Sequence, residues 1–133
     1  MSDVVIQQKL LLGFKAQAQI SNHAVGFDVP EEKGGRDTGP SPHDMLLASL
    51  GACTAITVRM YAKRKNWPLD DVTIEVSHEA FPKGQPIQKI ITLTGDLTDE
   101  QRNRLYAIAE KCPVNQLLAT PTEIVVKHHE GVL

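Results

Sequence analysis

The longest hydrophobic stretch of the chain lies near its centre, where no residue between Met45 and Val58 carries a formal charge. Apolar side chains continue to Tyr61 and fall on nearly every side of the helix that this stretch would form. A surface helix of a globular protein has one apolar and one polar face, so this helix must be enclosed by other structure. The pattern therefore predicts a buried central helix.

Short-range signals predict where this helix begins and ends. Ser41 is a suitable N-cap, Pro42 fits the first helical position, and Asp44 complements the positive end of the helix dipole. The pattern becomes polar at Lys63, and Pro68 ends the helix because it denies the helical conformation to the residue before it. These signals predict a helix of about 24 residues, roughly 36 Å long.

Alternating hydrophobic and polar positions predict strands on both sides of the helix. Residues 4–29 contain two or three short runs separated by turn residues, and residues 70–81 and 86–97 form an antiparallel hairpin. Residues 30–42 collect proline, glycine and charge, which predicts a long exposed loop. Loops of this length are often functional.

The C-terminal third begins with a capping box, in which Thr98 and Gln101 satisfy each other's backbone groups. Apolar residues follow at helical spacing, so Cys112 faces the core at the end of this helix. Residues 113–119 are predicted to form a further short helix, and residues 122–130 a closing strand.

Composition narrows the class of protein without changing the expected fold. Apolar residues make up 41% of the 133-residue chain and charged residues 23%, with a net charge of −2. This is the composition of one globular domain over residues 1–133. The grouped order of strands and helices favours an α+β fold with largely antiparallel sheets. The net charge gives no reason to expect a nucleic-acid partner.

The chain carries no recognisable targeting signal. Its first residues lack the basic and apolar regions of a signal peptide, and no segment approaches eighteen uninterrupted apolar residues. We therefore expect no membrane span and a cytoplasmic protein. In that compartment two cysteines are more often reduced thiols or a catalytic pair than a permanent structural disulfide.

The two cysteines leave two interpretations open. Cys53 sits inside the apolar helix, where free cysteine commonly packs as a small inert hydrophobe. Cys112 lies just ahead of a helix N-terminus, whose backbone N–H groups favour the reactive thiolate. No metal or other cofactor is expected, because there is no C-x-x-C motif and the five histidines are scattered.

Two long segments resemble the OsmC/Ohr family of osmotically inducible and organic hydroperoxide resistance proteins, in its OsmC-like branch. The first is GGRDTGPSPHDMLLASLGACTAITVRMYAKRKNWPL, from Gly34 to Leu69, and the second is DLTDEQRNRLYAIAEKCPVNQLL, from Asp96 to Leu118. With the intervening hairpin and the flanking strands, the similarity covers nearly the whole chain. The resemblance implies an intertwined homodimer, in which antiparallel sheets surround long buried helices and the active sites lie at the dimer interface.

The resemblance also implies a chemistry. Proteins of this family reduce hydroperoxides, usually organic ones, in defence against oxidative stress. Cys53 would be the peroxidatic thiol, which attacks the peroxide and becomes a sulfenic acid. Cys112 would be the resolving thiol, which condenses with the sulfenic acid to a disulfide. A small or protein-bound dithiol would then reduce that disulfide.

Family members also supply an arginine beside the reactive sulfur and a glutamate near the start of the long helix. Here the glutamate position, ten residues before Cys53, is His43, and the acid is Asp44, which also suits a helix-capping role. Arg36, in the glycine-rich loop before the helix, is the first candidate for the arginine. The other cationic candidates are Arg59 and Lys15.

Three functions are therefore to be separated by experiment. The leading hypothesis is a cysteine-based hydroperoxide reductase. The alternative is a non-enzymatic ligand-binding or redox-sensing protein, in which an apolar pocket around Cys53 holds a small hydrophobic molecule. The third is a structural dimer with inert thiols.

Overall fold

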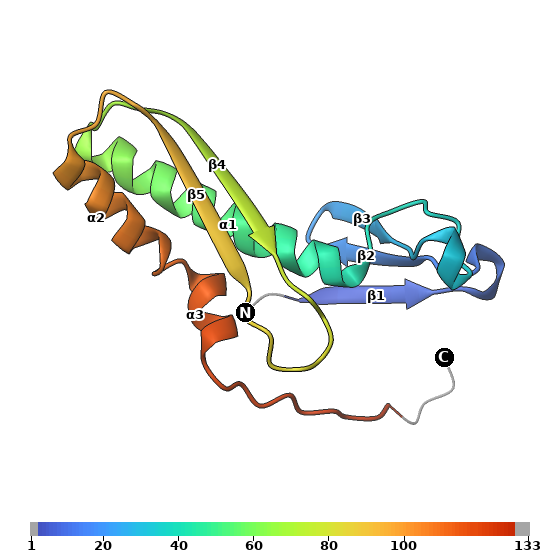
Figure 1. The fold of residues 1–133 in the computed structure, drawn as a ribbon. Coiled ribbons are helices and arrows are strands. Elements are labelled where there is room, and N and C mark those ends of the chain that lie inside the picture. The colour runs from blue at the N-terminus through green and yellow to red at the C-terminus, as the bar shows by residue number, and fades with distance from the viewer. Residues whose placement is uncertain (1–2, 130–133) are drawn as a thin grey trace. The chain divides into compact units, whose positions relative to one another are not determined.

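The structure is a computed structural model that describes residues 3–129 and mixes helices with antiparallel sheets, as the sequence predicts (Figure 1). Four short elements come first: strand β1, the 3-10 helix η1, and strands β2 and β3. A second 3-10 helix, η2, leads to the long helix α1, which is followed by the hairpin β4–β5 and by helices α2 and α3. The bounds are β1 Val4–Gln8, η1 Leu10–Leu12, β2 Ala16–Ile20, β3 His23–Phe27, η2 Glu31–Lys33, α1 Pro42–Lys65, β4 Leu69–Ser77, β5 Gln88–Gly95, α2 Asp99–Ala109 and α3 Pro113–Ala119.

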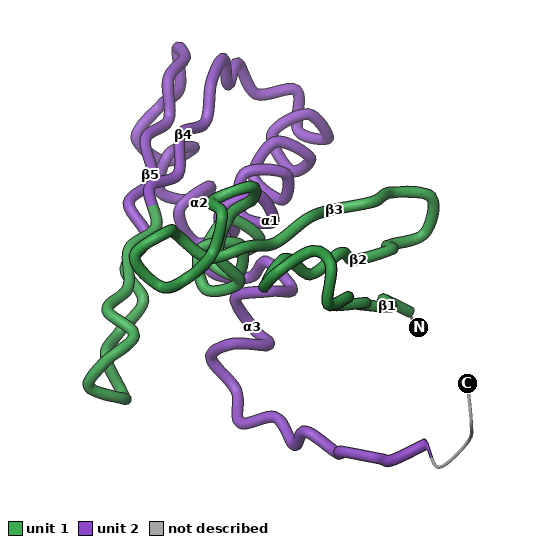
Figure 2. The backbone as a smooth tube through the Cα atoms, turned by 90° about the vertical axis from the view of Figure 1, so that its right-hand side faces the viewer, with its two compact units in different colours: residues 1–49, 76–88 green, residues 50–75, 89–133 purple. Residues whose placement is uncertain are grey.

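The chain divides into two compact units (Figure 2). The first comprises residues 1–49 and 76–88, and the second comprises residues 50–75 and 89–133. Helix α1 and the β4–β5 hairpin each contribute to both units. That residues 1–133 form a single domain stays a prediction.

The first unit contains an antiparallel sheet in the order β1-β2-β3. Val4 pairs with Ile20 between the first two strands, and Ile20 pairs with His23 between the second and third. The turn between β2 and β3 holds Ser21 at φ 56°, a left-handed conformation. The three strands confirm the alternating runs predicted for this part of the chain.

The loop after β3 is organised by the carboxylate of Asp28. It accepts hydrogen bonds from the Thr38 hydroxyl (2.7 Å), the Thr38 N–H (3.1 Å) and the Val29 N–H (2.8 Å). Gly35 approaches Val29 so closely that a Cβ there would lie 2.0 Å from the Val29 carbonyl oxygen. Only glycine fits this position, so the glycine-rich stretch has a structural reason.

These hydrogen bonds make the stability of the loop depend on pH. The bond from the Thr38 hydroxyl, reinforced by the backbone N–H of Val29, lowers the pKa of Asp28 from 3.8 to about 2. A carboxyl group with a lowered folded-state pKa stabilises the fold above its unfolded pKa, and this contribution disappears as the pH falls through the folded value. We expect the urea midpoint, followed by circular dichroism, to fall between pH 3.8 and about 2. The variant Asp28→Asn should lose this part of the pH dependence, and an unchanged curve would contradict the assignment.

The core of the second unit gathers apolar side chains from α1, β4, β5, α2 and the turn before α2. Its buried members are Val58, Ala62, Leu69, Leu93, Leu97, Leu105 and Ala109. Strands β4 and β5 bury alternate residues, as the period of two predicts. The hairpin and α2 are thereby fixed against the second half of α1 (Figure 1).

The ends of α1 confirm the sequence signals. Pro42 is its first residue, and the Ser41 hydroxyl accepts a hydrogen bond from the Asp44 N–H (3.2 Å). Asn66, at φ 58°, follows the last helical residue in a left-handed conformation. By length and composition alone, with a mean hydropathy of 1.4, α1 could cross a bilayer. Core helices of soluble proteins share these properties, so they are no independent evidence for a membrane.

The C-terminal part of the chain confirms two predictions and overturns a third. Thr98 and Gln101 form the predicted capping box at α2, and α3 begins at Pro113 as predicted. The closing strand predicted over residues 122–130 is wrong: residues 122–129 have no regular structure, and Glu130 lies outside the described residues. Their β-branched side chains stay exposed, and neither of the two described sheets includes this segment.

Candidate active site

The two cysteines meet in the second unit. Cys53 comes from the middle of α1 and is partly buried, whereas Cys112 caps the N-terminus of α3 and is fully buried. The Cys53 side chain lies close enough to Cys112 to contribute to lowering its pKa. The structure therefore brings together two thiols that lie far apart in the sequence.

Thr54, the residue after Cys53, connects α1 to Cys112. Its side chain is completely buried and donates a hydrogen bond to the Leu50 carbonyl oxygen one turn earlier (2.9 Å). The same oxygen, Thr54 Oγ1, lies 3.4 Å from Cys112 Sγ. The buried Thr54 hydroxyl thus connects the backbone of α1 to the sulfur of Cys112.

Lys89 of β5 supplies the positive charge of this site. Its ammonium group donates hydrogen bonds to Thr54 Oγ1 (2.9 Å), Ala109 O (3.0 Å) and Asn115 Oδ1 (2.8 Å). An ammonium group has three N–H donors, and all three are used here. Lys89 therefore ties together α1, α2 and α3 around Cys112.

The surroundings of Cys112 favour its thiolate. Burial raises the pKa of this thiol, but hydrogen bonds from Thr54, the Asn115 N–H and Cys53, together with the charge of Lys89, outweigh burial and hold the pKa below its ordinary value. The Asn115 N–H lies 3.3 Å from Cys112 Sγ. The site thus stabilises the negatively charged thiolate form of Cys112.

The two predicted site residues at the start of α1 lie in the first unit. His43 Nε2 is 2.9 Å from Nδ1 of His78, whose Nε2 donates to the Gln85 carbonyl oxygen (3.1 Å). Asp44 is largely exposed and lies 3.8 Å from His43 Nδ1. Across residues 3–129 there is no group of three or more His, Cys, Asp or Glu side chains that could hold a metal ion.

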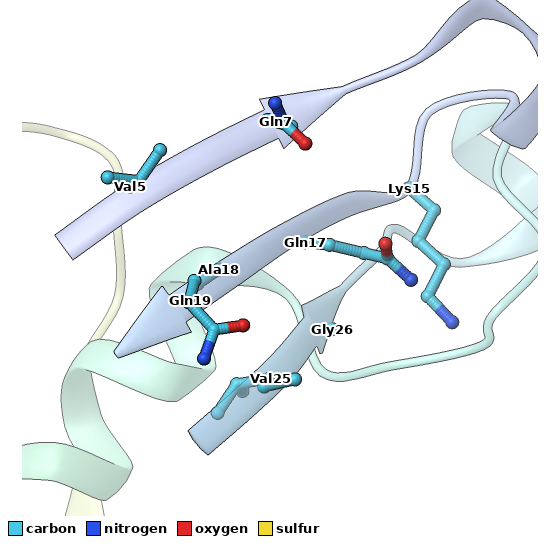
Figure 3. Close-up of a pocket in the computed structure, with 9 residues that line it drawn as sticks. Val5, Gln7, Lys15, Gln17, Ala18, Gln19, Val25 and Gly26 are labelled. Carbon is cyan, nitrogen blue, oxygen red and sulfur yellow. The ribbon is translucent and has the colours of Figure 1, made fainter. Parts of the chain in front are cut away.

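The three cationic candidates also have defined places. The guanidinium group of Arg36 lies beside Gly13 in the first unit. Arg59 donates to the carbonyl oxygens of Leu69 (2.6 Å) and Asp70 and so holds the start of β4. Lys15 lines a cavity of about 250 Å³ on the β1–β3 sheet together with Gln7, Gln17 and Gln19 (Figure 3).

Sequence reasoning missed the residues that surround Cys112, namely Thr54, Lys89 and Asn115. One signal was available for Lys89: it shares a strand face with Ile91 and Leu93, which point into the core. Lysine is rarely buried unless it has partners, so a lysine at such a position indicates a site. Nothing in the sequence alone indicated which groups it would meet.

The fold and this site define a class of protein: a mixed α+β protein with a cysteine pair shared between a long helix and a short one, beside a partly buried cation. The family of OsmC-like proteins matches residues 34–127. Because this match spans more than half of the chain, the protein belongs to the OsmC-like family. A comparison with curated protein sequences gives no significant match.

Solved structures show the same fold. A putative osmotic stress induced and detoxification response protein from Psychrobacter arcticus superposes with a TM-score of 0.73 at 23% identity, covering 88% of both chains. The organic hydroperoxide resistance protein OsmC of Legionella pneumophila gives 0.60 at 22% identity, covering 89% of this chain and 88% of that one. The organic hydroperoxide resistance protein of Bacillus subtilis gives 0.54 at 18% identity, covering 88% and 89%.

Proposed function

We propose that this protein reduces organic hydroperoxides, with Cys53 as the peroxidatic thiol and Cys112 as the resolving thiol. The observation that carries the proposal is the proximity of the two cysteines in the second unit, where the Cys53 side chain contributes to lowering the pKa of Cys112. A disulfide requires sulfurs that can reach bonding distance. Cys53 is the more accessible of the two, which suits first contact with the peroxide. The hydroperoxide resistance proteins among the structural relatives support the same substrate class.

The proposed reaction has three balanced steps. The Cys53 sulfur attacks the outer oxygen of the hydroperoxide, the O–O bond breaks, and the alcohol leaves with a proton while Cys53 becomes a sulfenic acid. Cys112 attacks that sulfur, so the S–S bond forms and water leaves. A small or protein-bound dithiol then reduces the disulfide and becomes a disulfide itself. We place the reaction in the cytoplasm, where such reductants keep thiols reduced.

We also propose that two copies of the chain form a homodimer. Helix α1 leaves Ile56 and Met60 exposed by 59% and 66% of their surface, and β1 and η1 expose further apolar side chains. Large exposed apolar side chains of this kind commonly mark an interface in a soluble protein. Arg36, His43 and Asp44, all in the first unit, are proposed as the residues that assist Cys53 in the assembled dimer.

Mixing the reduced protein with cumene hydroperoxide tests the proposed reaction. We expect rapid consumption of one equivalent, followed by loss of two hydrogen atoms from the protein mass as the disulfide forms. Stopped-flow measurement of the peroxide and intact-mass spectrometry of quenched samples report these two events. A protein that shows neither the mass loss nor a trapped sulfenic acid does not catalyse this reaction.

The replacement of the family's glutamate by His43 favours one other function, a ligand-binding or redox-sensing role. Such a protein would bind a small hydrophobic molecule saturably and would keep that binding in Cys53→Ala, with negligible peroxide turnover. Turnover that disappears in Cys53→Ala excludes this alternative. Inert thiols would instead react with iodoacetamide no faster than in the unfolded chain.

A further inference from the structure

Lys89 is a partly buried cation that has no acidic partner among the described residues. Its three hydrogen-bond acceptors, on Thr54, Ala109 and Asn115, are all neutral. Within residues 3–129, no carboxylate oxygen lies within 4.0 Å of its ammonium nitrogen. Taking an ammonium group out of water is costly unless an opposite charge compensates it. The site therefore favours a negative charge next to Lys89.

The sulfur of Cys112 is placed to carry that charge. Lys89 binds the side chains of Thr54 and Asn115, and the same two residues contact Cys112 Sγ through the Thr54 hydroxyl and the Asn115 N–H. Lys89 thus holds the Thr54 hydroxyl directly and binds the side chain of the residue whose N–H faces the sulfur. Cys53 is the other titratable group that acts on Cys112.

The hydrogen bonds of Thr54 can serve both protonation states of Cys112. A threonine hydroxyl has one donor and two acceptor positions. With a protonated thiol, Thr54 donates to Leu50 O and accepts from Lys89 and from the Cys112 S–H. With a thiolate, the Thr54 hydroxyl can turn to donate to the sulfur while Lys89 still donates to its oxygen. The ammonium group then polarises the hydroxyl that faces the anion.

We propose that Lys89, acting through Thr54 and Asn115, is a positioning residue for the reduction of a Cys53–Cys112 disulfide. When an external thiol reopens that disulfide, the incoming thiol bonds to Cys53 and Cys112 leaves as the thiolate. This inference rests on the proposed disulfide cycle and specifies its reduction. Attack on a disulfide is faster when the departing thiol forms the more stable thiolate. Access points the same way, because Cys112 is fully buried and Cys53 is not.

The reduction balances in two steps. The thiolate of the reductant attacks Cys53 Sγ, a mixed disulfide forms, and the bond between the two protein sulfurs breaks. The electron pair of that bond passes to Cys112 Sγ, where the Thr54 hydroxyl and the Asn115 N–H donate to it. The second thiol of the dithiol then attacks the outer sulfur, which releases Cys53 and leaves the reductant as a cyclic disulfide.

The position of the mixed disulfide tests the direction of attack. The protein is oxidised with diamide, so that the result does not depend on peroxide activity, and is then mixed with excess glutathione. Samples quenched with acid at short times are digested and mapped by mass spectrometry. We expect glutathione on the Cys53 peptide in at least about tenfold excess over the Cys112 peptide. Glutathione mainly on Cys112, equal labelling, or no disulfide after diamide would overturn the proposal.

Variants of Lys89 test its part in the reduction. Lys89→Met is expected to slow disulfide opening by roughly threefold to tenfold, because the leaving thiolate loses its compensating charge. Lys89→Arg should restore the rate to within about twofold, since the charge is kept. Lys111→Met, at an exposed lysine next to Cys112 in the sequence, should match the wild type.

A titration separates this role from a merely structural one. Thiolate absorbance at 240 nm in the reduced protein should show a low-pH step that is absent from Cys112→Ser and moved upward in Lys89→Met, with Lys89→Arg restoring it. Thr54→Val should shift the same step upward, whereas Thr54→Ser, which keeps the hydroxyl, should not. Should Lys89→Met not fold, the Thr54 pair decides the question. An unmoved step in Thr54→Val and in any folded Lys89→Met would overturn the proposal.

Discussion

Replacing Cys53 by serine is expected to abolish the consumption of cumene hydroperoxide, with turnover lowered by about 10³-fold or more. A serine hydroxyl is not ionised at neutral pH, and its oxygen is a far weaker nucleophile toward peroxide than a thiolate sulfur. The measurement is peroxide consumed over time in the presence of excess dithiothreitol. Ser49→Ala, an exposed position on the same helix, should retain the turnover of the wild type.

Cys112→Ser provides the informative comparison. Without a resolving thiol, the first peroxide is still reduced but the protein stays at the sulfenic acid, so its mass rises by one oxygen atom instead of falling by two hydrogens. A sulfenic acid that reacts with dimedone identifies this product. If Cys53→Ser kept its turnover, or if Cys112→Ser alone lost the first reaction, the roles assigned to the two cysteines would be wrong.

Replacing Met60 by glutamate is expected to convert the proposed homodimer into a monomer. Met60 and Ile56 are four residues apart on α1 and therefore lie on the same side of the helix. An unpaired carboxylate buried between two chains costs about 3–5 kcal/mol, which raises the dissociation constant by at least about a hundredfold. Light scattering during size-exclusion chromatography should change from twice the 14.6 kDa chain mass to once that mass.

The matched control for this experiment adds the same charge elsewhere. Asn103→Glu places a carboxylate at an exposed position of α2, and we expect it to remain dimeric. Circular dichroism of Met60→Glu establishes whether each chain keeps its helices. A wild-type protein that is monomeric at all concentrations, or a dimeric Met60→Glu, would exclude this face of α1 as the interface.

Local sequence signals were sufficient for the helices and the hairpin. Ser41 and Pro42 mark the start of α1, and Thr98 and Gln101 mark the start of α2, because capping depends on residues within one turn of each other. Cys112 could be placed in the core from its helical spacing alone. The closing strand could not be judged in this way, because a strand exists only when another strand pairs with it.

Local sequence signals were not sufficient to predict the candidate site. From the residues themselves, both cysteines could be inert, and only the resemblance to the OsmC/Ohr family assigned them a joint chemistry. His43 was identified from that resemblance, yet its contact with His78, 35 positions away, required the folded chain. The roles of Arg36, His43 and Asp44 stay predictions that the dimer and its variants must test.

By itself, the sequence determined helices α1, α2 and α3, the β4–β5 hairpin and a resemblance to a thiol-dependent family. It also predicted an enclosed α1, whereas the single chain leaves Ile56 and Met60 of that helix exposed. Only the tertiary structure decided that Lys89 and Thr54 meet at Cys112, because these residues come from different elements and lie 23 and 58 positions from it in the chain. Secondary structure follows from neighbours along the backbone. The charge that a thiol can carry follows from groups that packing brings to it from elsewhere.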